Sequence, residues 1–215
     1  MRKRSIIGTR ALKNVPFGGL LEVTMKKENL LHIFSRMPRL ETERLILRPM
    51  RVSDAGDMFE YAKNPDVTRY LLWRPHPNIE HTRSYLEYLA GRYRLGMHYE
   101  WAVILKEENR MIGTCGFCAV DCANNKGEIG YVLNPQYRGR EIMPEAVHRV
   151  LRFGFDMMGL HRIEARYMMG NDASRRVMDK VGMQFEGVQR EAMLVKGAYR
   201  DIGVCAILSN ECRTV

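Results

Sequence analysis

The chain has 215 residues, 46% of them hydrophobic and 27% charged, which is the composition of an ordinary globular protein of one domain. No apolar run approaches the ~20 residues that a membrane-spanning helix needs. The net charge of +9 does not by itself indicate nucleic-acid binding, because residues 1–36 hold eight Lys and Arg and two acids. The rest of the chain is only mildly basic.

Residues 1–36 are expected to form a basic extension, disordered or loosely docked, ahead of a single domain over 37–215. A transit peptide, or a native start at Met25 or Met37, is an alternative for this segment. The extension lacks the apolar core of 7–15 residues that a secretory signal needs. We therefore expect a cytoplasmic protein.

The cysteines support the same expectation, because several thiols without a secretory signal are typical of a reducing compartment. Cys115 and Cys118 have the spacing of zinc ligands, but the sequence offers no second Cys or His pair at the spacing that would complete a zinc site. We therefore expect no metal. The five cysteines are Cys115, Cys118, Cys122, Cys205 and Cys212.

The body begins with a strand and two helices. Residues 40–49 alternate apolar and polar side chains and predict a strand. Ser53 would cap a short helix that runs to about Lys63. Asn78 would cap a second helix, which the glycines at 91–96 end.

Three strand-like runs follow, at 98–105, 111–120 and 127–133. Polar turns at 106–110 and 121–126 join them. Short turns between consecutive strands predict an antiparallel meander.

The last part of the chain mixes helices and strands. Residues 142–158 form the strongest predicted helix, with one apolar face. The chain then predicts a strand at 162–169, a helix at 172–181, and a closing hairpin of 184–194 and 199–208. The apolar face of the first helix comprises Val147, Val150, Leu151 and Phe155.

A candidate phosphate site lies between the third strand of the meander and the helix after it. The strand ends at Leu133, an Asn-Pro turn and a basic glycine loop follow, and the helix begins near Ile142. Backbone N–H groups at the start of such a helix bind phosphates. Glu128 lies on the strand just before this loop. A carboxylate beside a phosphorylated cofactor indicates acid/base chemistry.

In order and spacing, these motifs resemble the general N-acetyltransferase (GNAT) superfamily, and within it the ribosomal-protein-serine/alanine N-terminal acetyltransferases. The likeness covers about residues 38–210. The resemblance implies an α/β (α+β) fold with a mixed, mostly antiparallel twisted sheet of about seven strands and four helices. The motifs are LETERLILRP (40–49), GEIGYVL (127–133), RGREIMPEA (138–146) with FGF (153–155), NDAS (171–174) with VGM (181–183), and YRD (199–201).

The resemblance implies acetyl-CoA as donor, bound by a loop of pattern Gln/Arg-x-x-Gly-x-Gly/Ala. Glu141 stands where this pattern has glycine, and Met143 where it has glycine or alanine. A carboxylate ~4–5 Å from a pyrophosphate would cost about 3–4 kcal/mol at an effective dielectric of ~20. We therefore expect Glu141 to turn toward solvent. The loop residues assigned to the cofactor are Arg138, Gly139, Arg140, Glu141, Ile142 and Met143.

The resemblance also implies the contacts of the pantetheine arm. Backbone groups of Tyr131, Val132 and Leu133 would bind it, and one N–H would polarise the thioester carbonyl. Asn171 would hydrogen-bond a pantetheine amide, and Ser174 would lie near the thioester and protonate the leaving thiolate. Without a ligand, these last two residues are typical of a helix N-terminus.

Glu128 is the predicted general base that takes a proton from the attacking amine. An α-amino group, with a pKa near 8, loses its proton to such a base more readily than a lysine side chain, with a pKa near 10.4. The alternative for Glu128 is an outward-facing strand residue in an ion pair. Four aromatic residues are candidates for the acceptor site, although each is also a common packing residue: Trp73, His76, His98 and Trp101.

The predicted function is transfer of acetyl from acetyl-CoA to a primary amine by direct attack in a ternary complex. Ribosomal-protein N-termini are the first candidate acceptors. A small amine (aminoglycoside, polyamine or amino acid) is an alternative acceptor, and a non-catalytic acyl-CoA-binding protein is an alternative function. A homodimer is left open. Nucleic-acid binding is not favoured, because the body lacks basic patches interleaved with aromatic residues.

Overall fold

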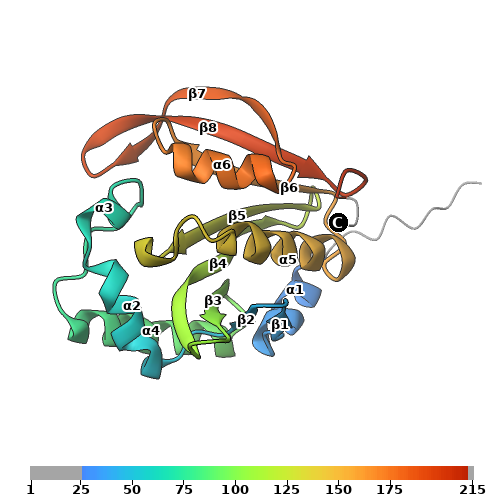
Figure 1. Cartoon of the computed structure of the whole chain (residues 1–215). Helices are drawn as coiled ribbons and strands as arrows, with labels where there is room; N and C mark the ends of the chain where they lie inside the picture. Colours follow the sequence, from blue (N-terminus) through green and yellow to red (C-terminus); the bar gives the residue numbers. More distant parts are fainter. Residues whose placement is uncertain (1–25, 213–215) are drawn as a thin grey trace, which may run out of the picture.

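The computed structural model describes residues 26–212, so the disorder expected for residues 1–25 falls outside it. Eight strands form one sheet in the order β1-β2-β3-β4-β5-β6-β8-β7 (Figure 1). The strands are β1 (Leu40–Glu41), β2 (Leu45–Arg48), β3 (Tyr99–Leu105), β4 (Arg110–Asp121), β5 (Lys126–Leu133), β6 (Arg162–Met168), β7 (Gln184–Val195) and β8 (Ala198–Leu208).

Helices cover both faces of this sheet (Figure 1). They are α1 (Lys27–Ser35), α2 (Ala55–Ala62), α3 (Pro65–Thr68), α4 (Ile79–Arg94), α5 (Ile142–Asp156) and α6 (Asp172–Lys180), with 3-10 turns η1 (Val52–Asp54) and η2 (Pro135–Tyr137). The predicted class, a mixed and mostly antiparallel sheet with helices, is confirmed, since only β5 and β6 pair in parallel.

The strand and helix counts exceed the prediction for local reasons. The strand predicted at 40–49 is split into β1 and β2, because Thr42 and Leu45 close a tight turn through their backbones. Helices α1 and α3 were not predicted. The predicted cap at Asn78 is present, and its side chain accepts from the His81 N–H at 2.8 Å. At the start of the earlier helix, the side-chain acceptor is Asp54 rather than Ser53. The buried Asp54 carboxylate accepts a hydrogen bond from the Arg51 backbone N–H at 2.7 Å.

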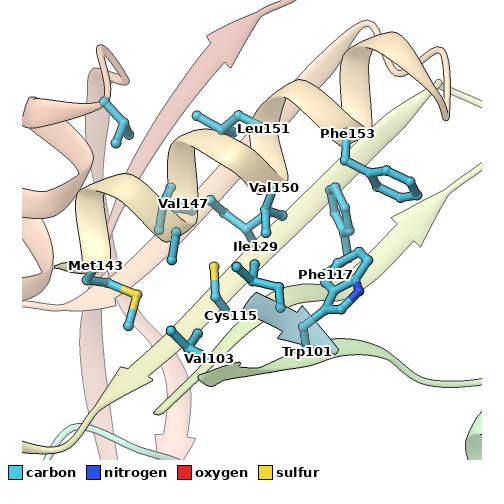
Figure 2. Packing of buried hydrophobic residues seen from close by; sticks show 14 of the residues in the cluster. Trp101, Val103, Cys115, Phe117, Ile129, Met143, Val147, Val150, Leu151 and Phe153 are labelled. Carbon is cyan, nitrogen blue, oxygen red and sulfur yellow. The ribbon is translucent and has the colours of Figure 1, made fainter. Parts of the chain in front are cut away.

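One face of the sheet carries the larger core. Three residues of the predicted apolar face of α5 are buried there over β3, β4 and β5 (Figure 2), whereas Phe155 is only partly buried. Cys115 points into this core. The side chains labelled in Figure 2 are Trp101, Val103, Cys115, Phe117, Ile129, Met143, Val147, Val150, Leu151 and Phe153.

Helix α1 packs into the same core, although it lies within the predicted extension. Phe34 is fully buried. Its ring centroid lies 5.7 Å from that of Trp101 and 6.1 Å from that of Phe153. This part of the extension therefore belongs to the packed domain.

Helices α2 and α4 cover the opposite face, where a second cluster of buried residues includes Met58, Leu86 and Leu89 beside Ala102 and Ile104 of β3. Every second residue of β3 thus faces α2 and α4. Within residues 26–212, no helix combines the length and the apolar character that a membrane crossing requires.

Candidate active site

The sheet opens between β5 and β6. These strands pair only from Lys126 with Arg162 to Ile129 with Ala165. Beyond that point β5 runs on to Leu133 and β6 to Met168, with no pairing between them. The end of β5 therefore presents a strand edge on which an extended ligand can form backbone hydrogen bonds.

A cavity of about 320 Å³ lies at this opening. Four segments form its walls: α3 with the residues just after it, the end of β5, the loop before α5 and helix α6. All the predicted site residues except Glu128 and Arg140 line it. These are Tyr131, Val132, Leu133, Arg138, Gly139, Glu141, Ile142, Met143, Asn171 and Ser174.

The loop before α5 contains a left-handed residue that is not glycine. Glu141 is the N-cap of α5, with φ 57° and ψ 20°. Glycine adopts this conformation freely, whereas other residues pay roughly 1–2 kcal/mol. The glycine of the family pattern therefore has a backbone reason at this position. The Glu141 side chain is 57% exposed and ion-pairs with Lys180, which agrees with the expected turn toward solvent.

Met143, the other departure from the pattern, does not crowd the outside of the loop. Its side chain is 3% exposed and lies within the core under α5 (Figure 2). Ile142 is buried in the same way. The large side chains in the first turn of α5 therefore point into the core.

Arg44, at the start of β2, holds the loop from outside the cavity. It donates to the carbonyl oxygens of Arg140 at 2.9 Å and Glu141 at 3.3 Å. Its Nε also donates to Glu145 at 2.7 Å. Burial alone would raise the pKa of Glu145, but hydrogen bonds from Thr42 and Arg44 lower it below the ordinary value. Because Arg44 takes up these carbonyl oxygens, the loop can present N–H groups to an anion.

The charge of the cavity comes from three cations and two acids. Arg138, Arg176 and Lys180 line it together with Asp66 and Glu141. Sequence reasoning missed Arg176 and Lys180. Their spacing of four residues on a predicted helix was the available signal, because such residues share a face.

The far end of the cavity holds two hydroxyl groups. The Tyr131 hydroxyl donates to the carbonyl of Ser174 at 2.8 Å and lies 3.1 Å from Ser174 Oγ. Burial raises the pKa of Tyr131 above its usual value, so the phenol stays protonated. Asn171 caps α6 by accepting from the Ser174 N–H at 3.3 Å. Met178, four residues after Ser174, lies in the core.

Glu128 lies apart from these groups. Its Oε2 is 3.4 Å from Nε of Arg166, and its side chain is 27% exposed. It lines neither this cavity nor the one described next. The ion pair considered as its alternative role is therefore present.

A second cavity, of about 600 Å³, lies on the side of α2 and α4. Val132 lines both cavities. Of the four aromatic candidates for an acceptor site, Trp73 and His76 line this cavity. Trp101 is fully buried in the core, and its indole N–H donates to Pro38 O at 2.7 Å. His98 contacts Glu100, a lining residue that sequence reasoning missed.

Comparisons with known proteins identify the family. Residues 44–184 match the model of the acetyltransferase (GNAT) domain. The uncharacterized N-acetyltransferase p20 of Bacillus licheniformis is 33% identical over 175 residues, which cover 81% of this chain and 98% of that protein. A GNAT-family acetyltransferase of Bacillus anthracis has a crystal structure similar to this fold, with a TM-score of 0.72 and 31% identity over 81% of this chain and 100% of that one.

A more distant relative is the [ribosomal protein uS5]-alanine N-acetyltransferase of Escherichia coli. It is 26% identical over 172 residues, which cover 76% of this chain and 87% of that protein. Together with the family model, these relatives show that the chain belongs to the GNAT superfamily. It is an N-acetyltransferase.

Proposed function

We propose that this enzyme transfers acetyl from acetyl-CoA to a primary amine by direct attack in a ternary complex. The observation that carries the proposal is that one residue, Val132, lines two cavities. One has a basic loop and an open strand edge, which suit a phosphorylated, extended donor. The other has aromatic walls and a carboxyl group, which suit an amine.

The residues of the first cavity fit coenzyme A. Arg138 and the N–H groups around Gly139 and Ile142 would bind its phosphates. The free edge of β5, from Tyr131 to Leu133, would bind pantetheine, and Asn171 would bind one of its amides. Ser174, hydrogen-bonded by Tyr131, would give a proton to the leaving sulfur.

For the acceptor we propose a protein N-terminus, with ribosomal proteins as the first candidates. The E. coli relative supports this by its name, at 26% identity. The chemistry supports it independently, because an α-amino group is about 10% neutral at pH 7 whereas a lysine is below roughly 0.1%.

An acetyl-transfer screen tests the function. The full chain is incubated with acetyl-CoA and a panel of peptide N-termini and small amines, and release of the free thiol is measured. We expect thiol release that depends on the amine. Failure to bind acetyl-CoA at about 1 mM by isothermal titration would contradict the proposal. Binding without turnover on any amine would favour an acyl-CoA sensor instead.

The predicted base has its own test. Glu128→Gln is expected to lower kcat at least tenfold, with little change in acetyl-CoA affinity, because the amide cannot accept a proton. Steady-state kinetics and isothermal titration measure the two effects. Glu87→Gln, on the exposed side of α4, is the matched control. Unchanged turnover of the Glu128 variant would reject the role.

A further inference from the structure

The second cavity has the lining of a binding site for an apolar group. Its walls include Trp73, Tyr85 and two methionines, Met50 and Met58. His76 packs among these rings, with its centroid 5.2 Å from that of Trp73. Apolar and aromatic walls with few polar groups are typical of small-molecule and side-chain pockets.

One buried polar group in this cavity has no partner within residues 26–212. Tyr61, on α2, is 1% exposed, and its hydroxyl forms no hydrogen bond there. Buried hydroxyl groups in folded proteins are nearly always hydrogen-bonded. Because Tyr61 lines the cavity, its hydroxyl is a candidate contact for a ligand.

Glu100 is the only carboxylate among the lining residues of this cavity. Burial raises its pKa to about 7. Its Oε2 lies 3.5 Å from Nε2 of His98, but burial lowers the pKa of His98 to about 4, so this ring is neutral. Across the described residues, no Lys or Arg side chain forms an ion pair with Glu100. Its negative charge is therefore available to a cationic ligand.

Besides Arg74 and His81, which line the same cavity, six titratable groups surround Glu100, and these six are neutral near pH 7. Burial raises the pKa of the tyrosines and cysteines among them above the usual values. None of them supplies a countercharge. These neighbours are Tyr61, Tyr85, Tyr93, His98, Cys115 and Cys118.

Two glycines lie in register between Glu100 and β5. Glu100 pairs with Gly116 of β4, and Gly116 pairs with Gly130 of β5. A Cβ on Gly116 would lie 2.3 Å from Cα of Glu100. Two side chains of β4 flank the route from Glu100 to β5: Cys118 Sγ lies 2.5 Å from where a Cβ of Gly130 would be, and Thr114, which pairs with Val132, lines the cavity. Two strand spacings of ~4.8 Å separate the backbone of Glu100 from that of β5.

We propose that Glu100 binds the ammonium group of the acceptor and takes its first proton, and that the acceptor is a monoamine with an apolar body. The inference rests on the proposed function and deepens it. A polycation such as spermidine suits this lining poorly, because the described lining residues include one carboxylate, Glu100, and a cation, Arg74. An α-amino group beside an apolar side chain matches both the charge and the walls.

The proton balance assigns separate roles to two carboxylates. The ammonium gives one proton to the Glu100 carboxylate, which later releases it to water. The neutral nitrogen then bonds to the thioester carbonyl carbon, and the carbon–sulfur bond breaks. The second proton leaves the nitrogen for a water molecule, which passes it to Glu128, the base predicted from the sequence, because Glu128 itself lines neither cavity. The sulfur departs with a proton from Ser174, which the solvent restores, to give an amide and a free thiol.

The test compares kcat and KM for leucinamide, a monoamine, and spermidine across pH 6–9. Wild type should prefer leucinamide by at least tenfold in kcat/KM, and its rate should fall below pH 7 as Glu100 becomes protonated. Glu100→Gln should raise KM for leucinamide at least tenfold and remove the acid limb near pH 7. Glu87→Gln should do neither.

Acetyl-CoA titration and an unfolding curve of the Glu100 variant check that the fold and donor site are intact. An unchanged KM and pH profile in this variant would overturn the role of Glu100 while leaving the proposed function in place. Equal or better use of spermidine by wild type would overturn the monoamine class. Failure of wild type to bind acetyl-CoA would overturn the proposed function and this inference with it.

Discussion

Glu141 is energetically unfavourable at its position for two reasons. Its backbone is left-handed, and its carboxylate lies beside a loop suited to phosphates. The ion pair with Lys180 relieves the second cost, but both side chains are about half exposed, and such pairs contribute about 0–1 kcal/mol. The pair also engages Lys180, one of the three cations that line the cavity, so that Lys180 is less available to a phosphate.

Two substitutions separate these effects. Glu141→Gln removes the charge and frees Lys180, so acetyl-CoA affinity should rise roughly tenfold, or about 1.4 kcal/mol. Glu141→Gly should do the same and also raise the free energy of unfolding by about 0.5–1 kcal/mol, because glycine accepts the left-handed backbone. Isothermal titration and denaturant unfolding measure both quantities. Weaker binding in both variants would show that the carboxylate helps the site.

Single residues differ in how far the sequence reveals them. The loop and Asn171–Ser174 were predictable from motifs, because each motif is local. Glu100 had a weaker signal, since it alternates with Ala102 and Ile104 and therefore had to face the same side of the sheet. Arg44 lies in the motif at 40–49, but its contact with the loop has no local signal, because the carbonyl oxygens it binds lie 96 and 97 residues away.

At the scale of elements, the opening between β5 and β6 makes the site. Both strands were predicted to within one or two residues, but the point where they separate was not. Pairing between strands about 36 residues apart depends on tertiary packing, which a local sequence pattern does not predict. The wall above the opening is equally non-local. Lys196, in the turn between β7 and β8, donates to the carbonyl of Thr68 in α3 at 2.6 Å.

Helix α1 gives an element-scale prediction. Phe34→Ala should lower the free energy of unfolding by about 3–5 kcal/mol, because it empties a fully buried site between aromatic rings. Denaturant unfolding of the full chain measures the change. His32→Ala, an exposed position on the same helix, should stay within about 0.5 kcal/mol. An equally small effect at Phe34 would mean that α1 is not part of the core.

At the scale of the molecule, the two faces of the sheet have different tasks. The face under α1 and α5 is packed with apolar side chains, whereas the face under α2 and α4 leaves a cavity around Glu100. The proposed donor cavity opens where the sheet itself separates, and Val132 lines both cavities. This arrangement lets a donor and an acceptor approach from different sides, as direct transfer requires.

The most direct test of this account is mass spectrometry of a reaction between the full chain, isotopically labelled acetyl-CoA and leucinamide. We predict labelled N-acetyl-leucinamide in amounts equal to the free thiol released, and none without the protein. Release of thiol without labelled amide, or no reaction although acetyl-CoA binds, would contradict direct acetyl transfer to an amine held beside Val132.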